Sequence, residues 1–563
     1  MAIQYGSDAL DDVFTTASGG NDTFYGGDNG GTGGGNDTFS LGGVNDIFYG
    51  GIGNDTVNSL NGNDTLSAGN GNDLLYGEDG NDSLNGGNND DVAWGGIGND
   101  SIAGGNENDT LFGGEGIDVL NAGNNNDTLF GGDGVDTLYG GGSDDTLFGG
   151  AAASGFANTI FGGALTDTVS YVDETVTVYA DLGTGGGHVG GVLLDTMSLI
   201  ENLVGGSGND VLVGDGLANS LAGGARTDLL FGGNGDDTLV GGTAASGEYN
   251  QLFGGAGNDT AGYAAETTAV TASLAGYYAY VGGIAPADLR DIYNSIENLT
   301  GGSGNDSLEG DGLANTLTGG TGSDLLFGGD GDDLLFGGTI STGIANQLWG
   351  GNGIDTANYL GETARVTADL DGLYGYVGGI APADLRDLFN AIENLTGGTG
   401  NDLLAGNAAV NVIDGGAGSG NDTLWGRGGN DALTGGDGND WLLGNDGIDT
   451  LTAGTGADRV YWFGSETGGA DIVTDFASAQ GDKFYLLSGG FGSYAAAQTI
   501  DLFTGTGTSD AIFAAHVAQG FAYDTATGAL YFDADGSAGG FAATQIATLS
   551  NLATLLASDF VVI

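Results

Sequence analysis

The sequence contains no cysteine and only two prolines among its 563 residues. Without cysteine, neither disulfides nor thiolate metal sites can hold the chain together. Proline usually accompanies glycine in low-complexity chains, so two prolines beside 122 glycines argue against generic low complexity. No apolar run reaches the length of a membrane-spanning helix, and we therefore predict no transmembrane segment.

Basic residues are also scarce, because 7 Lys and Arg face 75 Asp and Glu, giving a formal net charge of −68. Nucleic acid and anionic membrane surfaces need basic patches, so both are poor partners for a chain of this composition. A compact monomer with such a charge would repel itself. We therefore expect either a disordered chain or a cation that allows the chain to fold.

What the sequence has in abundance is a nine-residue repeat, of which residues 95–103 (GGIGNDSIA) are one copy. A large apolar residue follows the repeat aspartate two positions later, as Leu111 follows Asp109, with Ala93 as the exception. Asp22 precedes the regular run in the same pattern, and Asp12 is a weaker candidate. Thirteen aspartates recur at this interval: Asp37, Asp46, Asp55, Asp64, Asp73, Asp82, Asp91, Asp100, Asp109, Asp118, Asp127, Asp136 and Asp145.

Each repeat combines a turn with a short strand. Glycine reaches the positive φ values that sharp turns require. The remaining residues are too few for a helical turn but suit one strand with its apolar side chain pointing inward. Two repeats would close one flattened coil, and coils would stack about 4.8 Å apart through parallel strands. The predicted fold class is all-β, a parallel β-roll.

The aspartate has two possible explanations, a turn residue or a metal ligand. Asn and Asp both form turns, so a turn position would accept either. The residue before the aspartate varies, with Ile117, Val135 and Asp90 among its forms, whereas none of the thirteen aspartates is replaced by Asn. The position therefore needs a carboxylate, and carboxylate with glycine-turn carbonyls favours Ca²⁺ over zinc or copper.

The repeat G-G-x-G-x-D-x-U-x resembles the RTX (repeat-in-toxin) nonapeptide of secreted bacterial proteases, lipases, cytolysins and surface-layer proteins. The resemblance implies a parallel β-roll with many Ca²⁺ ions held between successive coils by aspartates and glycine-turn carbonyls. In five copies another residue replaces the glycine at the fourth position of the repeat, and we expect weaker calcium binding there. The five are Val44, Asn89, Glu107, Asn125 and Ser143.

From about residue 156 the repeats are interrupted by inserts with a period of 96 residues, marked by Ile-Glu-Asn-Leu at 200–203, 296–299 and 392–395. The inserts carry alternating β-type sequence and are predicted to be strands or loops that protrude from a continuing roll; small separate modules are the alternative. They are either spacers or surfaces for lateral or ligand contacts. Repeat aspartates continue at Asp210, Asp228, Asp237, Asp259, Asp306, Asp324, Asp333, Asp355 and Asp402, but Asn219, Asn315 and Asn411 occupy aspartate positions and should bind calcium poorly.

We expect four parts: an N-terminal roll over 1–150, repeat blocks with inserts over 151–415, a further run over 416–460, and a β-rich cap over 461–563. The run at 416–460 carries Asp422, Asp431, Asp440, Asp449 and Asp458. The cap resembles the C-terminal secretion region of RTX proteins related to the serralysin proteases, which implies a type I exporter and no N-terminal signal peptide. Within it, Asp533-x-Asp535-Gly536 resembles the start of an EF-hand loop, but Thr544 replaces the closing glutamate, so we predict a hairpin turn or a weak extra site.

No enzyme motif is present. The two histidines, His188 and His516, are far apart, and the sequence contains no H-E-x-x-H, G-x-S-x-G or phosphate-binding loop. Repeats begin by Asp22, which leaves no N-terminal room for a catalytic domain. We therefore expect a non-enzymatic, extracellular calcium-binding protein with a structural role at the bacterial surface, as in a surface layer or matrix, with self-association or cell-surface polysaccharide as partners. A secreted adhesin or carbohydrate-binding module is the alternative, and a polysaccharide-active enzyme with paired acids is a third.

Overall fold

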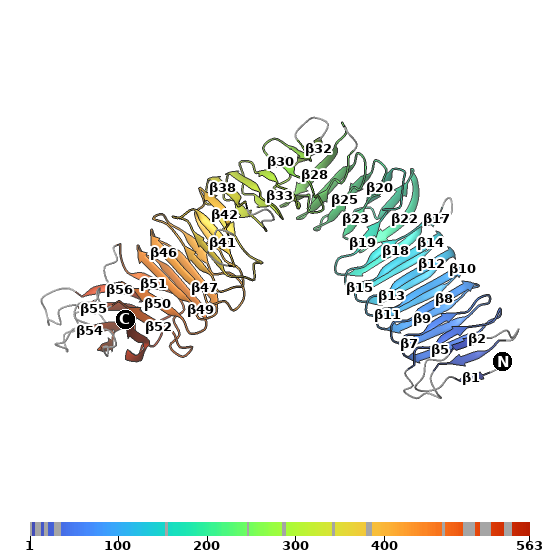
Figure 1. Ribbon diagram of the computed structural model, residues 1–563, viewed down its shortest axis with the longest axis horizontal. Coiled ribbons are helices and arrows are strands. Elements are labelled where there is room, and N and C mark those ends of the chain that lie inside the picture. The colour runs from blue at the N-terminus through green and yellow to red at the C-terminus, as the bar shows by residue number, and fades with distance from the viewer. Residues whose placement is uncertain are drawn as a thin grey trace. The chain divides into compact units, whose positions relative to one another are not determined.

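The computed structural model describes residues 3–5, 13–15, 21–26, 35–152, 156–244, 247–283, 289–339, 344–378, 385–463, 468–487, 501–506, 520–533 and 543–563 (Figure 1). Apart from a 3-10 turn at Ala557–Asp559, every regular element in these ranges is a β-strand. Two compact units share the chain: one comprises Met1–Gly262, Tyr277–Tyr280 and Ile284–Ile296, and the other comprises Tyr263–Gly276, Val281–Gly283 and Glu297–Ile563.

In the first unit, consecutive nine-residue repeats place their strands alternately in two sheets. One sheet contains β5 (Ile47–Ile52), β7 (Thr65–Asn70), β9 (Ser83–Asn88), β11 (Ser101–Asn106), β13 (Val119–Asn124), β15 (Thr137–Gly142) and β18 (Asn158–Ala164). The other contains β4 (Thr38–Ser40), β6 (Thr56–Asn58), β8 (Leu74–Asp79), β10 (Val92–Ile97), β12 (Thr110–Gly116), β14 (Thr128–Gly134), β16 (Thr146–Phe148) and β19 (Thr168–Ser170). All neighbours are parallel, and most pairs join residues one coil apart, such as Leu111 and Leu129 (Figure 1).

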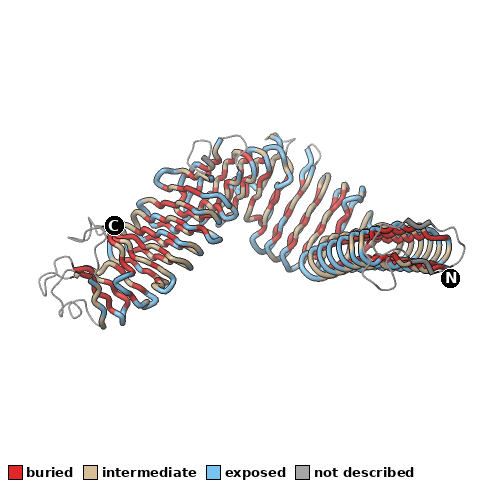
Figure 2. The backbone as a smooth tube through the Cα atoms, turned by 60° about the horizontal axis from the view of Figure 1, so that its bottom comes forward, coloured by how far each residue is buried: buried red, intermediate tan, exposed pale blue. Residues whose placement is uncertain are grey.

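The apolar residue of each repeat forms the core between the two sheets. Leu66, Leu84 and Ile102 from one sheet and Leu111 and Leu129 from the other are at most 1% exposed. Along each strand, buried and solvent-facing residues alternate, as the red and pale segments of Figure 2 show. The core is thin, so its stability depends on how the turns at its margins are held. The predicted all-β parallel roll is confirmed.

The fourth position of the repeat needs a left-handed backbone, as Gly98 shows with φ of 140°. Where glycine is missing there, Asn89, Glu107, Asn125 and Ser143 still adopt φ between 72° and 83°. Positive φ values are unfavourable for residues with a side chain. They persist only where contacts with the surrounding structure compensate. The effect of these four residues on calcium affinity stays a prediction.

The inserts add strands to the sheet rather than forming separate modules. In the first insert, β22 (Val192–Ser198) pairs parallel with β18, and β20 (Val178–Asp181) pairs parallel with β24 (Val211–Val213). Between them, β21 (Gly186–Val189) runs antiparallel to both. The third insert repeats this order with β42 (Leu385–Asn390), β41 (Tyr374–Val377) and β40 (Val366–Asp369), placed between β38 (Asn346–Asn352) and β44 (Leu403–Ala405).

Further strands continue the roll toward the C-terminus. β46 (Thr423–Gly428), β48 (Trp441–Asp446), β50 (Arg459–Trp462), β52 (Lys483–Leu486) and β57 (Phe560–Val562) pair parallel in one sheet. β54 (Gly520–Asp524), β55 (Ala529–Asp533) and β56 (Thr544–Leu549) form an antiparallel set. In the described ranges no helix has the length and apolar character needed to cross a membrane.

Candidate calcium sites

All 28 repeat aspartates proposed from the sequence are buried, and none is more than 5% exposed. They form columns at the edges of the sheets, because residues one coil apart share a register. One carboxylate oxygen acts within the column: Oδ1 of Asp100 accepts the backbone N–H of Asp82 at 2.7 Å, and Oδ1 of Asp118 accepts that of Asp100 at 2.8 Å. The Asn158 side chain does the same for Asp136 at 2.9 Å. Capping alone therefore does not require a carboxylate.

The second carboxylate oxygen is what separates aspartate from asparagine. Among the described residues, twenty of the proposed aspartates bury Oδ2 with no hydrogen-bond partner. Burying a polar atom without a hydrogen-bond partner is unfavourable. A column of such oxygen atoms therefore points to a missing cation. The twenty are Asp55, Asp64, Asp73, Asp82, Asp91, Asp100, Asp109, Asp118, Asp127, Asp136, Asp145, Asp228, Asp237, Asp324, Asp333, Asp355, Asp431, Asp440, Asp449 and Asp458.

Backbone carbonyls converge on the same space. A Cβ added at Gly77 would lie 2.5 Å from the carbonyl oxygen of Gly95 and 2.6 Å from Oδ2 of Asp82. At Gly435 the carbonyl oxygen of Ala453 and Oδ2 of Asp440 would lie at 2.5 and 2.6 Å. Only a residue without a side chain fits there, and both neighbours are hydrogen-bond acceptors.

These donors fit calcium. The described residues contain no group of three or more His, Cys, Asp or Glu side chains that could hold a metal, so backbone carbonyls must supply most ligands. Ca²⁺ takes carboxylate and carbonyl oxygens in flexible arrangements, whereas zinc and copper prefer nitrogen and sulfur. Asp82 Oδ2 and the Gly95 carbonyl are representative of the atoms that would hold it.

Burial raises the pKa of these carboxyls, to about 8 for Asp91 and Asp127 and to about 7 for Asp55 and Asp82. The backbone hydrogen bond to each carboxylate lowers the pKa in part, while the neighbouring aspartates of the column raise it again. Without a metal, the ionised column is therefore unfavourable near neutral pH. A divalent cation would reverse this by stabilising the charged form.

Four aspartates differ from this arrangement. Gly42, Gly206, Gly302 and Gly398 donate their backbone N–H groups to the second oxygen of the repeat aspartate four residues later, at 2.7–3.0 Å. These carboxylates have partners for both oxygens without any metal. The four are Asp46, Asp210, Asp306 and Asp402.

The three asparagine positions are satisfied by the protein itself. Nδ2 of Asn219 donates to the Glu201 carbonyl at 2.9 Å, and its Oδ1 accepts the Asp215 N–H at 2.8 Å. Asn315 and Asn411 make the equivalent bonds to carbonyls at 2.8 and 2.6 Å. The neutral amide oxygen lies on the side on which most aspartates present a bare Oδ2, and there it already accepts a backbone N–H, while the amide nitrogen takes the capping side. The prediction that these loops are calcium-poor gains a physical reason.

Comparison with known families agrees with this geometry. The model of the RTX calcium-binding nonapeptide repeat matches residues 31–66, 59–93, 85–120, 121–153, 293–312, 309–339, 389–419, 417–442 and 443–461. These segments of the chain carry RTX nonapeptide repeats. The nonapeptides bind Ca²⁺ at many sites, and the assignment of individual aspartates to those sites is our proposal.

A second family model, the serralysin C-terminal region of peptidase M10, matches residues 172–299. The resemblance to serralysins is thus confirmed, but it lies over the first inserts and repeat blocks rather than at 461–563. No curated protein matches the chain in sequence. Among solved structures, an extracellular lipase from Serratia marcescens matches with 19% identity over 46% of this chain and 40% of the lipase chain, at a TM-score of 0.15.

The structure adds site residues that the sequence search missed. Asp167 is buried, its Oδ1 accepts the Asp145 N–H at 2.9 Å, and its Oδ2 has no partner among the described residues. It follows Asp145 by 22 residues rather than 18, which hid it from a strict period. The Gly162-Gly163 pair five residues earlier, as before Asp355, was the available signal.

The Ile-Glu-Asn-Leu motif also acquires a role. Oε2 of Glu201 accepts the Asp167 N–H at 2.9 Å, and Glu393 does the same for Asp355. The longer glutamate side chain thereby takes over the capping function of a column aspartate. The asparagine of the motif caps the next coil, since Asn202 Oδ1 accepts the Ser220 N–H at 2.9 Å.

Some sequence candidates lie outside the described residues, namely Asp12, His516 and the Asp535-Gly536 part of the EF-hand-like segment. His188 lies on β21, and its ring is 5.9 Å from that of Tyr179. In the described part of the chain His188 belongs to no group of three or more His, Asp or Glu side chains that could hold a metal.

Proposed function

We propose that this RTX protein is secreted, folds when calcium enters its loops outside the cell, and then serves a structural role at the bacterial surface. One observation carries the proposal: twenty buried aspartates each keep an oxygen without a protein partner in the described structure. Together with the net charge of −68, this leaves the metal-free roll short of positive charge. Calcium supplies that charge, so metal binding and folding become one equilibrium.

Export follows from the same equilibrium. Extracellular calcium modules bind with dissociation constants of about 10⁻⁴–10⁻³ M, far above cytosolic calcium. The chain would stay unfolded inside the cell and fold outside it. The serralysin-type match supports a type I exporter as the partner for this step.

The character of the matched family segments supports a structural rather than a catalytic role. The RTX and serralysin C-terminal models describe non-catalytic parts of their families. One face of the first unit also carries a ladder of stacked rings: Tyr76, Trp94, Phe112, Phe130 and Phe148, with centroids 4.5–5.3 Å apart. Because neighbouring rings cover one another's faces, the ladder stiffens the coil stack and leaves mainly ring edges exposed.

A secreted adhesin or carbohydrate-binding module is the second candidate, favoured by exposed apolar side chains on the first insert. Val176, Tyr179, Val192 and Leu193 are 40–54% exposed, although the insert strands pair within the sheet. Such residues would serve lateral contacts between copies or contacts with a surface polysaccharide.

Two experiments test these proposals. Circular dichroism at pH 7.5 should show a much weaker β-sheet signal in chelator than in millimolar calcium; a β-signal indifferent to calcium would refute calcium-driven folding. Electron microscopy of the calcium-loaded protein separates the two roles. Ordered sheets or filaments favour the structural role, whereas persistent monomers that bind a glycan array favour the adhesin.

A further inference from the structure

Three arginine side chains donate hydrogen bonds to turn carbonyls that lie next to asparagines of the aspartate columns. The sequence has only seven basic residues, and three of them donate from Nη1 to the carbonyl oxygen of a turn glycine. The bonds are Arg290 to Gly242 at 2.7 Å, Arg386 to Gly338 at 2.8 Å, and Arg427 to Gly406 at 2.8 Å. Each lies beside a column position that holds asparagine: Asn250, Asn346 and Asn411 respectively.

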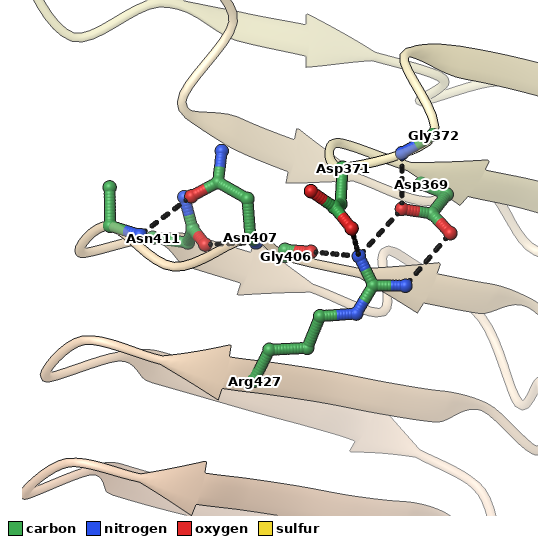
Figure 3. Close-up of polar contacts among 8 residues, drawn as sticks. Asp369, Asp371, Gly372, Gly406, Asn407, Asn411 and Arg427 are labelled. Carbon is green, nitrogen blue, oxygen red and sulfur yellow. Dashed lines mark hydrogen bonds and ion pairs between the residues drawn. The ribbon is translucent and has the colours of Figure 1, made fainter.

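Arg427 shows the arrangement most fully (Figure 3). Its Nη1 and Nη2 donate to Oδ1 and Oδ2 of Asp369, both at 2.8 Å, and Asp371 lies 3.7 Å away. With the Gly406 carbonyl, the guanidinium is surrounded by two carboxylates and a backbone carbonyl. That is the oxygen donor set that calcium takes.

Gly406 corresponds to the glycines that line the candidate calcium loops. It precedes Asn411 by five residues, as Gly95 precedes Asp100. In the candidate loops the carbonyl of such a glycine faces an aspartate Oδ2, as the Gly95 carbonyl faces Asp82. The Gly406 carbonyl is taken by a guanidinium on the side of the preceding coil, at Asp369. The Asn411 side chain lies on the other side of Gly406, facing the Gly426 carbonyl.

The contacts of the Arg427 guanidinium offset an unfavourable backbone conformation at the same residue. Its φ is 74°, and the equivalent position one repeat later is Gly436, with φ of 103°. A left-handed conformation costs a residue with a side chain stability unless its surroundings compensate. The strength of the contact with Asp369 is seen in the pKa of that carboxyl. Burial raises the pKa, but the hydrogen bonds and positive charge of Arg427 bring it below its ordinary value.

Arg386 provides a second case with the same chemistry. It bonds to the Gly338 carbonyl and pairs with Glu362 at 2.9 Å. Beside it, Nδ2 of Asn346 donates to Oδ1 of the fully buried Asp387 at 2.8 Å. Here the cation bonds the second glycine of the turn, next to the Gly337 position where the Asn346 amide and Asp387 meet.

We propose that these arginines are built-in substitutes for calcium, which bring a fixed cation to turn carbonyls beside the asparagine positions of the column and hold those coils without metal. The inference rests on calcium ligation by the aspartate loops under the proposed function. It predicts that the segments around Arg386 and Arg427 keep their structure in chelator. It also predicts that removing the guanidinium and restoring the carboxylate opens a site for one more Ca²⁺.

The test uses the full chain and four variants: Arg427→Gly, Asn411→Asp, the double variant, and Arg459→Gln as control. Arg427→Gly restores the repeat glycine and relieves the backbone, so any destabilisation comes from the lost contacts. The control removes the same charge from a side chain stacked on Trp441 at 4.7 Å. Hydrogen exchange in residues 366–372 and 403–414 reports on the coil, and equilibrium dialysis counts bound calcium.

In chelator, Arg427→Gly should raise exchange in these segments at least about tenfold, the loss expected for charge-assisted hydrogen bonds, while the control leaves it unchanged. The double variant should bind one more calcium than the wild type, and calcium should restore its slow exchange. Unchanged exchange in Arg427→Gly, or no additional calcium in the double variant, would overturn the inference. A wild-type chain that binds no calcium in equilibrium dialysis would overturn the proposed function as well. That measurement needs only the wild-type chain, so the two failures can be distinguished.

Discussion

Two adjacent aspartates with the same charge offer a matched test of the candidate sites. Asp91 is 1% exposed, its Oδ1 accepts the Asp73 N–H at 2.8 Å, and its Oδ2 has no partner in the described structure. Asp90 is exposed, and its Oδ1 accepts the Asn108 N–H at 3.0 Å. Asp91→Asn and Asp90→Asn each remove one negative charge from neighbouring residues, but only the first removes a candidate ligand.

In chelator, Asp91→Asn should stabilise the coil. An asparagine can keep the Oδ1 bond, as Asn158 does for Asp136 at 2.9 Å, and its Nδ2 can then donate to a turn carbonyl, as Asn158 Nδ2 does to Gly150 at 3.5 Å. Relief of a buried unpaired oxygen contributes about 1–3 kcal/mol. Asp90→Asn should change the coil by no more than about 0.5 kcal/mol, as expected for a surface position.

With calcium, Asp91→Asn should lose part of the stabilisation that the metal gives. At a calcium concentration 100 times the dissociation constant, each occupied site contributes about 2.7 kcal/mol. The calcium-induced gain should therefore fall by about 2.7 kcal/mol for each site lost. Asp90→Asn should keep the full gain.

Native-state hydrogen exchange of residues 83–106, in chelator and in calcium, measures both quantities locally and does not require two-state unfolding. If Asp91→Asn and Asp90→Asn have the same effect under both conditions, the buried oxygen is not a calcium ligand. Destabilisation of Asp91→Asn in chelator would refute the argument about the unpaired oxygen.

Three further predictions follow from the same structure. Asn315→Asp should lose the Nδ2 bond to the Glu297 carbonyl, destabilise the metal-free coil by about 1–3 kcal/mol and add a bound calcium in dialysis, whereas unchanged stoichiometry would contradict it. Because burial raises the pKa of Asp91 from 3.8 to about 8, the stability of the metal-free roll should be fully present below about pH 4 and decline as the pH rises to about 8. Circular dichroism of metal-stripped protein should therefore show more β-structure at pH 5 than at pH 8, and the opposite order would refute the pKa argument. Phe112→Ala should lower thermal stability, with about 0.5–1.5 kcal/mol from lost ring stacking in addition to buried area, and leave calcium stoichiometry unchanged.

The roll itself was predictable from the sequence because its period is short and its chemistry repeats. Leu66, Leu84 and Ile102 could be assigned to the core from their spacing alone. The choice of aspartate over asparagine was visible by comparing repeats within one chain. The structure adds the physical reason, since one oxygen caps the coil and the other lacks a protein donor.

What the sequence could not reveal depends on contacts between distant residues. Asp167 was missed because a coil of 22 residues breaks the period, and Glu201 because a glutamate reaches the same N–H from a different position. The insert strands were expected to protrude, but their register within the sheet follows from pairings such as Asp195 with Asn158. The contact of Arg427 with Asp369 spans 58 residues, a separation at which no local pattern predicts proximity.

A crystal structure of the calcium-loaded protein tests the central claim most directly, because anomalous scattering locates each ion. The account predicts ions beside the aspartate Oδ2 atoms and the glycine carbonyls, as at Asp82 and Gly95, and none beside Asn219, Asn315 or Asn411. Empty aspartate loops in saturating calcium, or ions bound equally at the asparagine positions, would contradict it.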